Sequence, residues 1–145
     1  MLAVDASLVV ELSLDRIDQH ASEALGDEEL VAPSLLWSEV TSVLHELAFR
    51  AEISRKLTGW ALERFLTGEI EVDERRPEEL TMAAWQLADE LGWAKTYDAE
   101  YVALAKILGC RLVTLDMRLW RGTKHLGFVV TPEELKPKPP SEEKR

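Results

Sequence analysis

The 145-residue sequence contains a single cysteine, Cys110, so no disulfide can form within the chain. This scarcity is typical of proteins from a reducing compartment, and we interpret Cys110 as an inert packing residue beside a buried strand. The sequence also lacks a basic segment ahead of its first apolar residues, and it has no apolar run near the roughly 20 residues that span a bilayer. We therefore expect a cytoplasmic protein without a membrane segment.

Basic residues are scarce as well, with 17 Lys and Arg against 27 Asp and Glu and a net charge of −10. This balance argues against tight nonspecific nucleic-acid binding. It does not exclude a nuclease, because acids around a metal site add negative charge that bound cations neutralise. The three histidines, at positions 20, 45 and 125, are too scattered to predict a zinc site.

The apolar residues, 46% of the chain, alternate between strand-like and helix-like segments. The expected strands are Leu2–Val4, Leu30–Ala32, Glu69–Val72, the segment from Arg111 to Asp116, and Gly127–Val130. The expected helices are Ser7–Leu14, Asp18–Leu25, Ser34–Arg50, Ser54–Leu66, Pro77–Leu91, Tyr97–Leu108 and a short one after Asp116. This order predicts an α/β fold with a mainly parallel sheet of four to five strands covered on both faces.

The sequence predicts one domain over residues 1–135, followed by a charged, proline-rich tail at 136–145 that we expect to be disordered. Within the domain, Leu36, Val40, Val43 and Leu47 fall at helical spacing and predict the buried stripe of a long helix. Trp60 lies on a helix of mixed character. We interpret the helix pair from Ser34 to Leu66 as a groove for a partner helix.

Two of the predicted strand segments end in a lone aspartate, Asp5 and Asp116. The carboxyl ends of parallel strands meet at one edge of a sheet, and open α/β sheets place their chemistry there. Each aspartate could also be only the N-cap of the helix that follows it. Two such residues on the same edge favour a site.

Glu39 and Asp98 are further acids, each next to an apolar helix face. Asp98 precedes Tyr101 and Val102 at helical spacing, which points it along the inward face. Such a charge is costly unless it is paired or binds a metal. The alternatives are a surface glutamate at position 39 and a first-turn aspartate favoured by the helix dipole at position 98. Glu100 points elsewhere and is expected to be a solvated surface acid.

Four converging carboxylates suit Mg²⁺ or Mn²⁺, which prefer oxygen ligands. One or two such ions would activate water and stabilise charge on a scissile phosphate. The pattern therefore predicts metal-dependent hydrolysis of phosphodiester bonds, with the water activated by metal and no side chain assigned as general base.

Four segments together resemble the PIN-domain ribonucleases, and most closely the small VapC-type toxins of toxin–antitoxin pairs. The segments are Val4–Ser7, Pro33–Val40, Tyr97–Ala105 and Leu112–Asp116. The resemblance implies a three-layer α/β/α fold and an endoribonuclease acting on RNA such as transfer or ribosomal RNA. It also implies a cognate antitoxin protein as partner, and a homodimer.

The resemblance also assigns roles to residues of this sequence. The acids that match the catalytic, metal-binding set are Asp5, Glu39, Asp98 and Asp116. Ser7 and Thr114 match hydroxyl neighbours that would order ligands and waters, and Ser42 stands where many relatives carry Asn. Basic residues that could meet RNA phosphates are Arg118, Arg121 and Lys124, with Lys95 a weaker candidate and a solvated basic helix the alternative.

Other functions are compatible with parts of the pattern. A housekeeping RNA-processing nuclease would use the same four acids. A non-catalytic module that binds protein or RNA would tolerate the loss of one, yet all four are present. A phosphorylated receiver domain fits poorly, since its paired acids and late lysine are missing. A haloacid-dehalogenase-type phosphatase fits no better, because Asp5-Ala6-Ser7 lacks the second aspartate.

Overall fold

The computed structural model describes residues 1–135. The predicted tail at 136–145, and with it the boundary of the domain, lies outside the described residues. In the described part of the chain, no helix is long and apolar enough to cross a membrane.

A five-stranded sheet, parallel throughout, forms the centre of the fold, with strand order β3-β2-β1-β4-β5. The strands are β1 (Leu2–Val4), β2 (Leu30–Ala32), β3 (Asp73–Glu74), β4 (Arg111–Val113) and β5 (Val129–Val130). The central strand β1 pairs Ala3 with Val31 of β2 and with Leu112 of β4. The buried residues of β1, β2 and β4 are all Leu, Ala or Val, as a sheet covered on both faces requires, and only Arg111 at the start of β4 is exposed. The predicted parallel sheet of four to five strands is confirmed.

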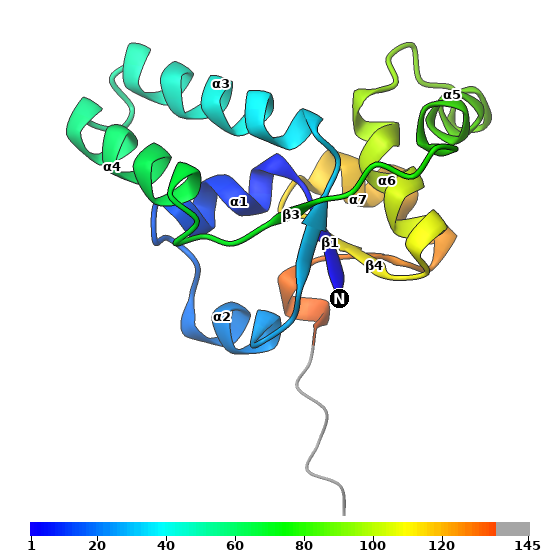
Figure 1. Ribbon diagram of the computed structural model, residues 1–145, viewed down its shortest axis with the longest axis horizontal. Helices are drawn as coiled ribbons and strands as arrows, with labels where there is room; N and C mark the ends of the chain where they lie inside the picture. Colours follow the sequence, from blue (N-terminus) through cyan, green and yellow to red (C-terminus); the bar gives the residue numbers. More distant parts are fainter. Residues whose placement is uncertain (136–145) are drawn as a thin grey trace, which may run out of the picture.

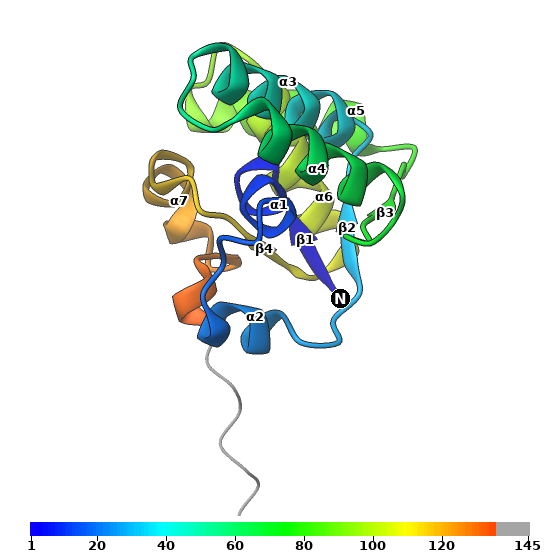
Figure 2. The same ribbon diagram turned by 90° about the vertical axis from the view of Figure 1, so that its left-hand side faces the viewer.

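Helices cover both faces of the sheet in the three-layer arrangement that the sequence predicts (Figures 1 and 2). Within residues 1–135 they are α1 (Ala6–Ser13), α2 (Gln19–Leu25), α3 (Leu35–Phe49), α4 (Arg55–Leu66), α5 (Leu80–Leu91), α6 (Tyr97–Leu108) and α7 (Met117–Thr123). Helix α6 packs against β1 and β4 and carries α5 on its other side, while α1 packs against α3 and α4. In Figure 1 the α3–α4 pair and the α5–α6 pair lie on opposite sides of the upper half of the molecule.

Helix boundaries follow the capping residues of the sequence. Asp18 and Ser54 accept hydrogen bonds from backbone N–H groups in the first turns of α2 and α4, at 2.7 and 3.1 Å. Gly109 ends α6 in the left-handed conformation, with a φ of +65°, which glycine adopts without a steric penalty. After β5, Thr131 and Glu134 form a capping box at a short 3₁₀ helix, η2 (Pro132–Glu134).

Two details of the sequence interpretation are wrong. The predicted strand Glu69–Val72 is loop, and pairing with β2 begins only at Asp73. Ile70 and Val72 alternate because they pack against the core from an irregular segment, in which the Ile70 N–H donates to the carbonyl of Arg64 at the end of α4. In α3 the fully buried line continues from Val40 to Leu44, whereas Val43 is 37% exposed and Leu47 is half-buried.

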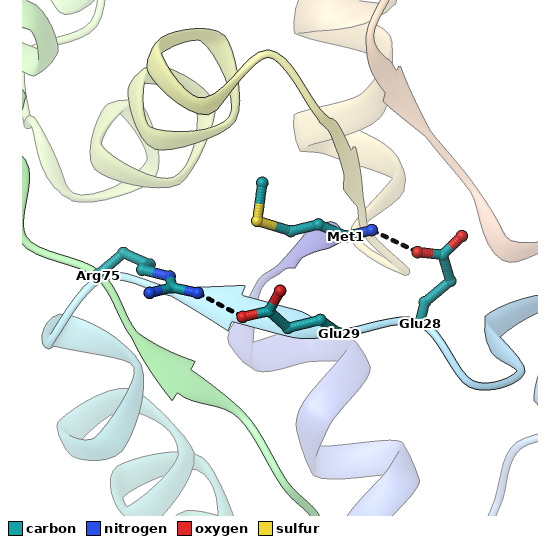
Figure 3. Close-up of polar contacts among 4 residues, drawn as sticks. All are labelled: Met1, Glu28, Glu29 and Arg75. Carbon is teal, nitrogen blue, oxygen red and sulfur yellow. Dashed lines mark hydrogen bonds and ion pairs between the residues drawn. The ribbon is translucent and has the colours of Figure 1, made fainter.

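Polar contacts tie the segment before β2 to Met1, just ahead of β1, and to Arg75, just after β3 (Figure 3). The Met1 ammonium contacts Glu28, and the Arg75 guanidinium contacts Glu29. These groups are partly exposed and screened by water, so the two ion pairs contribute little to stability. The contacts fix the connection into β2.

Candidate active site

Asp5 follows β1 directly, and its carboxylate is buried, with the residue only 5% exposed. Its Oδ1 accepts hydrogen bonds from the Leu8 N–H at 3.2 Å and from the Ser7 hydroxyl at 2.6 Å. Asp5 is therefore the N-cap of α1, and its carboxylate also lies at the carboxyl end of the sheet.

Thr114 connects Asp5 to the end of β4. Its fully buried hydroxyl donates to Asp5 Oδ2 and accepts from the Asp116 N–H at 3.0 Å. The Ser7 oxygen accepts from the Leu115 N–H at 3.0 Å and lies 3.3 Å from the Thr114 oxygen. This network links the ends of β1 and β4 and fixes the orientation of the Asp5 carboxylate.

Asp116 lies three residues after the end of β4 and is exposed. Its Oδ1 accepts from the N–H groups of Arg118 and Leu119 at 3.0 and 3.2 Å, which makes it the N-cap of α7. One carboxylate oxygen is thus occupied by the helix, while the described residues donate no hydrogen bond to Oδ2.

Three of the predicted acids line one pocket of about 660 Å³ at this edge of the sheet. Glu39 enters from the first part of α3, Asp98 from the first turn of α6, and Asp116 from the start of α7. Glu39 is half-buried, whereas Asp98 is exposed. Asp5 is not a lining residue, but its charge raises the pKa of Glu39, so it lies near enough for electrostatic interaction. The structure therefore brings three segments of distant sequence to one acidic pocket and places Asp5 near it.

Burial and mutual repulsion raise the pKa values of Asp5, Glu39 and Asp98. The pKa of Glu39 rises to about 7, first through burial and then through the charges of Asp98 and Asp5. Burial raises the pKa of Asp5 to about 6, although hydrogen bonds from Ser7, Thr114 and Leu8 oppose the rise. Burial and the Asp116 charge raise the pKa of Asp98, and Arg118 opposes this. A bound cation would relieve this concentration of like charge.

The residues at the pocket fit a hard divalent cation. All four acids offer oxygen ligands, which Mg²⁺ and Mn²⁺ prefer. A buried polar atom also lacks a partner here: the Tyr101 hydroxyl has none among residues 1–135 and lies among these acids. In the same part of the chain, no three His, Cys, Asp or Glu side chains already stand close enough together to hold one ion. The pocket supplies the donor chemistry, and the side chains would have to draw together around the ion.

The remaining predicted residues divide between this pocket and other surfaces. Arg118 and Lys95 line the pocket beside the acids. Arg121 and Lys124 are exposed on and just after α7 and are not among the lining residues, and the Lys124 ammonium lies 4.9 Å from the centre of the Trp120 ring. Ser42 is exposed and lines a different depression, on the outer face of α3.

Two residues near the pocket were not predicted as part of it. Glu100 was expected to be a solvated surface acid, but it is half-buried and its charge raises the pKa of Glu39. Tyr101 is buried, with only 1% of its surface exposed. The spacing of Tyr101 three residues after Asp98 placed it on the inward face, yet nothing in the sequence showed that its hydroxyl would lie among carboxylates.

Comparisons with known proteins agree with this fold. Residues 2–124 match the family model of the PIN domain. The chain is 35% identical over 127 residues to a VapC ribonuclease of Mycobacterium bovis and to the ribonuclease VapC9 of Mycobacterium tuberculosis, covering 82% of this chain and 88% of each relative. The crystal structure of PAE2754 from Pyrobaculum aerophilum superposes with a TM-score of 0.67, at 24% identity over 92% of this chain and 90% of that one.

Proposed function

The chain belongs to the PIN-domain family, and we propose that it is a VapC-type endoribonuclease that hydrolyses RNA phosphodiester bonds at the acidic pocket. The observation that carries this proposal is the meeting of Glu39, Asp98 and Asp116 on one pocket, with Asp5 buried next to them. The similarity to named ribonucleases over most of the chain supports the same reaction.

Asp5, Glu39, Asp98 and Asp116 are the residues that would hold one or two Mg²⁺ or Mn²⁺ ions. When bound, such ions supply an activated water and a counter-charge for the phosphate. The chain itself contributes orientation. Ser7 and Thr114 hold the Asp5 carboxylate in one rotamer, and backbone N–H groups of α7 hold Asp116 by one oxygen. No other side chain at the pocket is placed as a general base.

RNA would enter at the side of the pocket that carries positive charge. Arg118 and Lys95 lie beside the acids, and a guanidinium can hold a phosphate through two hydrogen bonds. With a net charge of −10 over the chain, these two residues would attract the substrate only locally. We therefore assign Arg118 and Lys95 to the phosphate neighbouring the scissile bond, and Arg121 and Lys124 to a more distant part of the RNA.

A cognate antitoxin is the proposed protein partner, which would make this chain the toxin of a type II pair. The α3–α4 pair exposes apolar side chains that a partner helix could cover: Trp60 is 43% exposed, Leu57 38% and Phe49 75%. The Trp60 ring is stacked under the Arg64 guanidinium at 4.4 Å, which holds it in place on the surface. Unchanged antitoxin affinity in Trp60→Ala would remove this surface from the proposal. The homodimer remains a proposal as well, to be checked by analytical ultracentrifugation.

Cleavage of a mixed pool of transfer and ribosomal RNA by the purified chain tests the proposal. We expect discrete fragments with Mg²⁺ or Mn²⁺, none with a chelator, and at least a hundredfold slower cleavage by Asp98→Asn with unchanged circular dichroism. Asp89→Asn is the matched control, because Asp89 is exposed on α5 and does not line the pocket. Equal activity in Asp98→Asn and Asp89→Asn would show that the cleavage does not arise at this pocket.

A further inference from the structure

The Tyr101 side chain places a hydroxyl inside the protein without a hydrogen-bond partner. Tyr101 lies one turn after Asp98 on α6 and is 1% exposed. No group in residues 1–135 makes a hydrogen bond with its hydroxyl. Buried polar groups in native folds almost always have a partner, because they give up their hydrogen bonds to water. The missing partner indicates that the resting arrangement of this region is incomplete.

Carboxylates surround the hydroxyl. Burial raises the pKa of Tyr101, and the charges of Glu39, Asp5, Asp98 and Glu100 raise it further, in that order of effect. The phenol therefore keeps its proton, which it can donate to a neighbouring carboxylate. Glu39 is its principal neighbour, since the Tyr101 hydroxyl is near enough to oppose part of the rise in the pKa of Glu39. The two groups nevertheless do not meet the geometry of a closed hydrogen bond.

We propose that Tyr101 is a positioning residue for Glu39: its hydroxyl donates to the Glu39 carboxylate when that carboxylate ligates a divalent cation, and it fixes the orientation that ligation requires. The inference rests on the proposed function, because it assumes that Glu39 binds metal. A carboxylate that gives one oxygen to a cation keeps the other as an acceptor. Hydrogen-bonded partners of this kind orient ligands and contribute to metal affinity.

This role has opposite consequences in the two states of the protein. In the metal-free protein the hydroxyl is an unpartnered buried group, so its removal should not reduce stability. In the metal-bound protein the hydroxyl makes a hydrogen bond to a charged acceptor, so its removal should weaken binding. A hydroxyl that serves only to hold the core together would show the reverse, with a loss of stability and no effect on the metal.

The test is Tyr101→Phe, which deletes the hydroxyl and keeps the ring. Thermal unfolding in chelator measures the metal-free protein, and calorimetric titration with Mn²⁺ measures affinity. We expect an unchanged or higher Tm in chelator and about tenfold weaker Mn²⁺ binding. Ser13→Ala is the matched control, because Ser13 is also fully buried with an unpartnered hydroxyl but lies at the far end of α1 from Asp5. It should leave Mn²⁺ affinity unchanged.

Mn²⁺ affinity in Tyr101→Phe equal to that of the wild type would overturn the inference. If the Tm in chelator were also lower, the hydroxyl would belong to the core alone. If neither the wild type nor Ser13→Ala binds Mn²⁺, the metal site of the proposed function is itself wrong and the inference fails with it. The wild-type titration thus separates failure of the site from failure of the role given to Tyr101.

Discussion

Replacing Asp5 by asparagine should stabilise the metal-free protein while abolishing its activity. Burial raises the pKa of Asp5 from 3.8 to about 6, even though three hydrogen bonds favour its charged form. A rise of about two pH units corresponds to about 3 kcal/mol of unfavourable free energy when the group is ionised. Because Asp5 is only 5% exposed, solvent screens little of this penalty.

The sign of the effect follows from proton binding. Between pH 3.8 and about 6, folded Asp5 retains a proton that the unfolded chain has released. Stability of the wild type therefore falls as the pH rises through this range, and the contribution of the neutral carboxyl is lost above about pH 6. Asparagine cannot ionise, so Asp5→Asn lacks this part of the pH dependence. At pH 7.5 the variant should be more stable by about 2 kcal/mol, after a small allowance for altered hydrogen bonds.

The hydrogen-bond network around Asp5 can accept an amide. The amide oxygen can take the place of Oδ1 and accept from the Ser7 hydroxyl and the Leu8 N–H. The amide NH₂ then faces the Thr114 oxygen, and the Thr114 hydroxyl can turn to donate to Ser7, whose oxygen lies 3.3 Å away. No buried group loses its partner, so the relief of charge burial is the larger effect.

Thermal unfolding in chelator from pH 4 to 8 measures this difference. For a chain of this length, about 2 kcal/mol corresponds to a Tm higher by roughly 6 °C at pH 7.5. The gap should narrow towards zero near pH 4. Asp18→Asn is the control, since Asp18 is an exposed helix cap where Asp and Asn are equivalent. A lower Tm for Asp5→Asn at pH 7.5, or a gap that does not change with pH, would refute the argument.

Three further predictions test the pocket, the core and the backbone. Arg118→Ala should weaken RNA binding and reduce the slope of log affinity against log salt by about 1, whereas Arg121→Ala, away from the pocket, should weaken binding less. Binding titrations at several salt concentrations measure the affinity and the slope for both variants. Leu44→Ala should cost about 2–5 kcal/mol in urea unfolding and Val43→Ala within about 1 kcal/mol, and equal costs would contradict the observed stripe of α3. Gly109→Ala should cost about 1 kcal/mol in the same assay, because alanine is strained at a φ of +65°.

The approach of Asp5 and Asp116 could be predicted because it follows from the sheet topology. Parallel strands place their carboxyl ends on one edge, so Asp5 and Asp116 had to lie near each other once β1 and β4 paired. Helical spacing placed Asp98 beside apolar residues of α6. The unequal burial of these acids could not be predicted, because it depends on how α1 and α3 pack over the end of β1. That packing leaves Asp116 and Asp98 exposed and buries Asp5.

The errors share a physical cause, because each inferred a contact between residues from a short sequence pattern. The alternation of Ile70 and Val72 reflects packing of a loop rather than strand pairing. Ser42 follows Glu39 by three residues, yet α3 turns it to the outer face. The surroundings of the Tyr101 hydroxyl could not be predicted, because spacing shows which face a side chain takes and not what its polar atom meets.

The acidic pocket makes the metal-free fold less stable than it would be with neutral side chains at the same positions. Burying Asp5 and half-burying Glu39 raises the pKa of both, and the neighbouring acids add to the repulsion at Glu39. A fold selected for stability alone would carry neutral side chains at these positions. The charges are explained if a cation is the partner of the site, since its binding recovers the energy that folding spends on them. The predicted gain in stability of Asp5→Asn and its predicted loss of activity therefore have one cause, the placement of a carboxylate where only a bound cation makes it favourable.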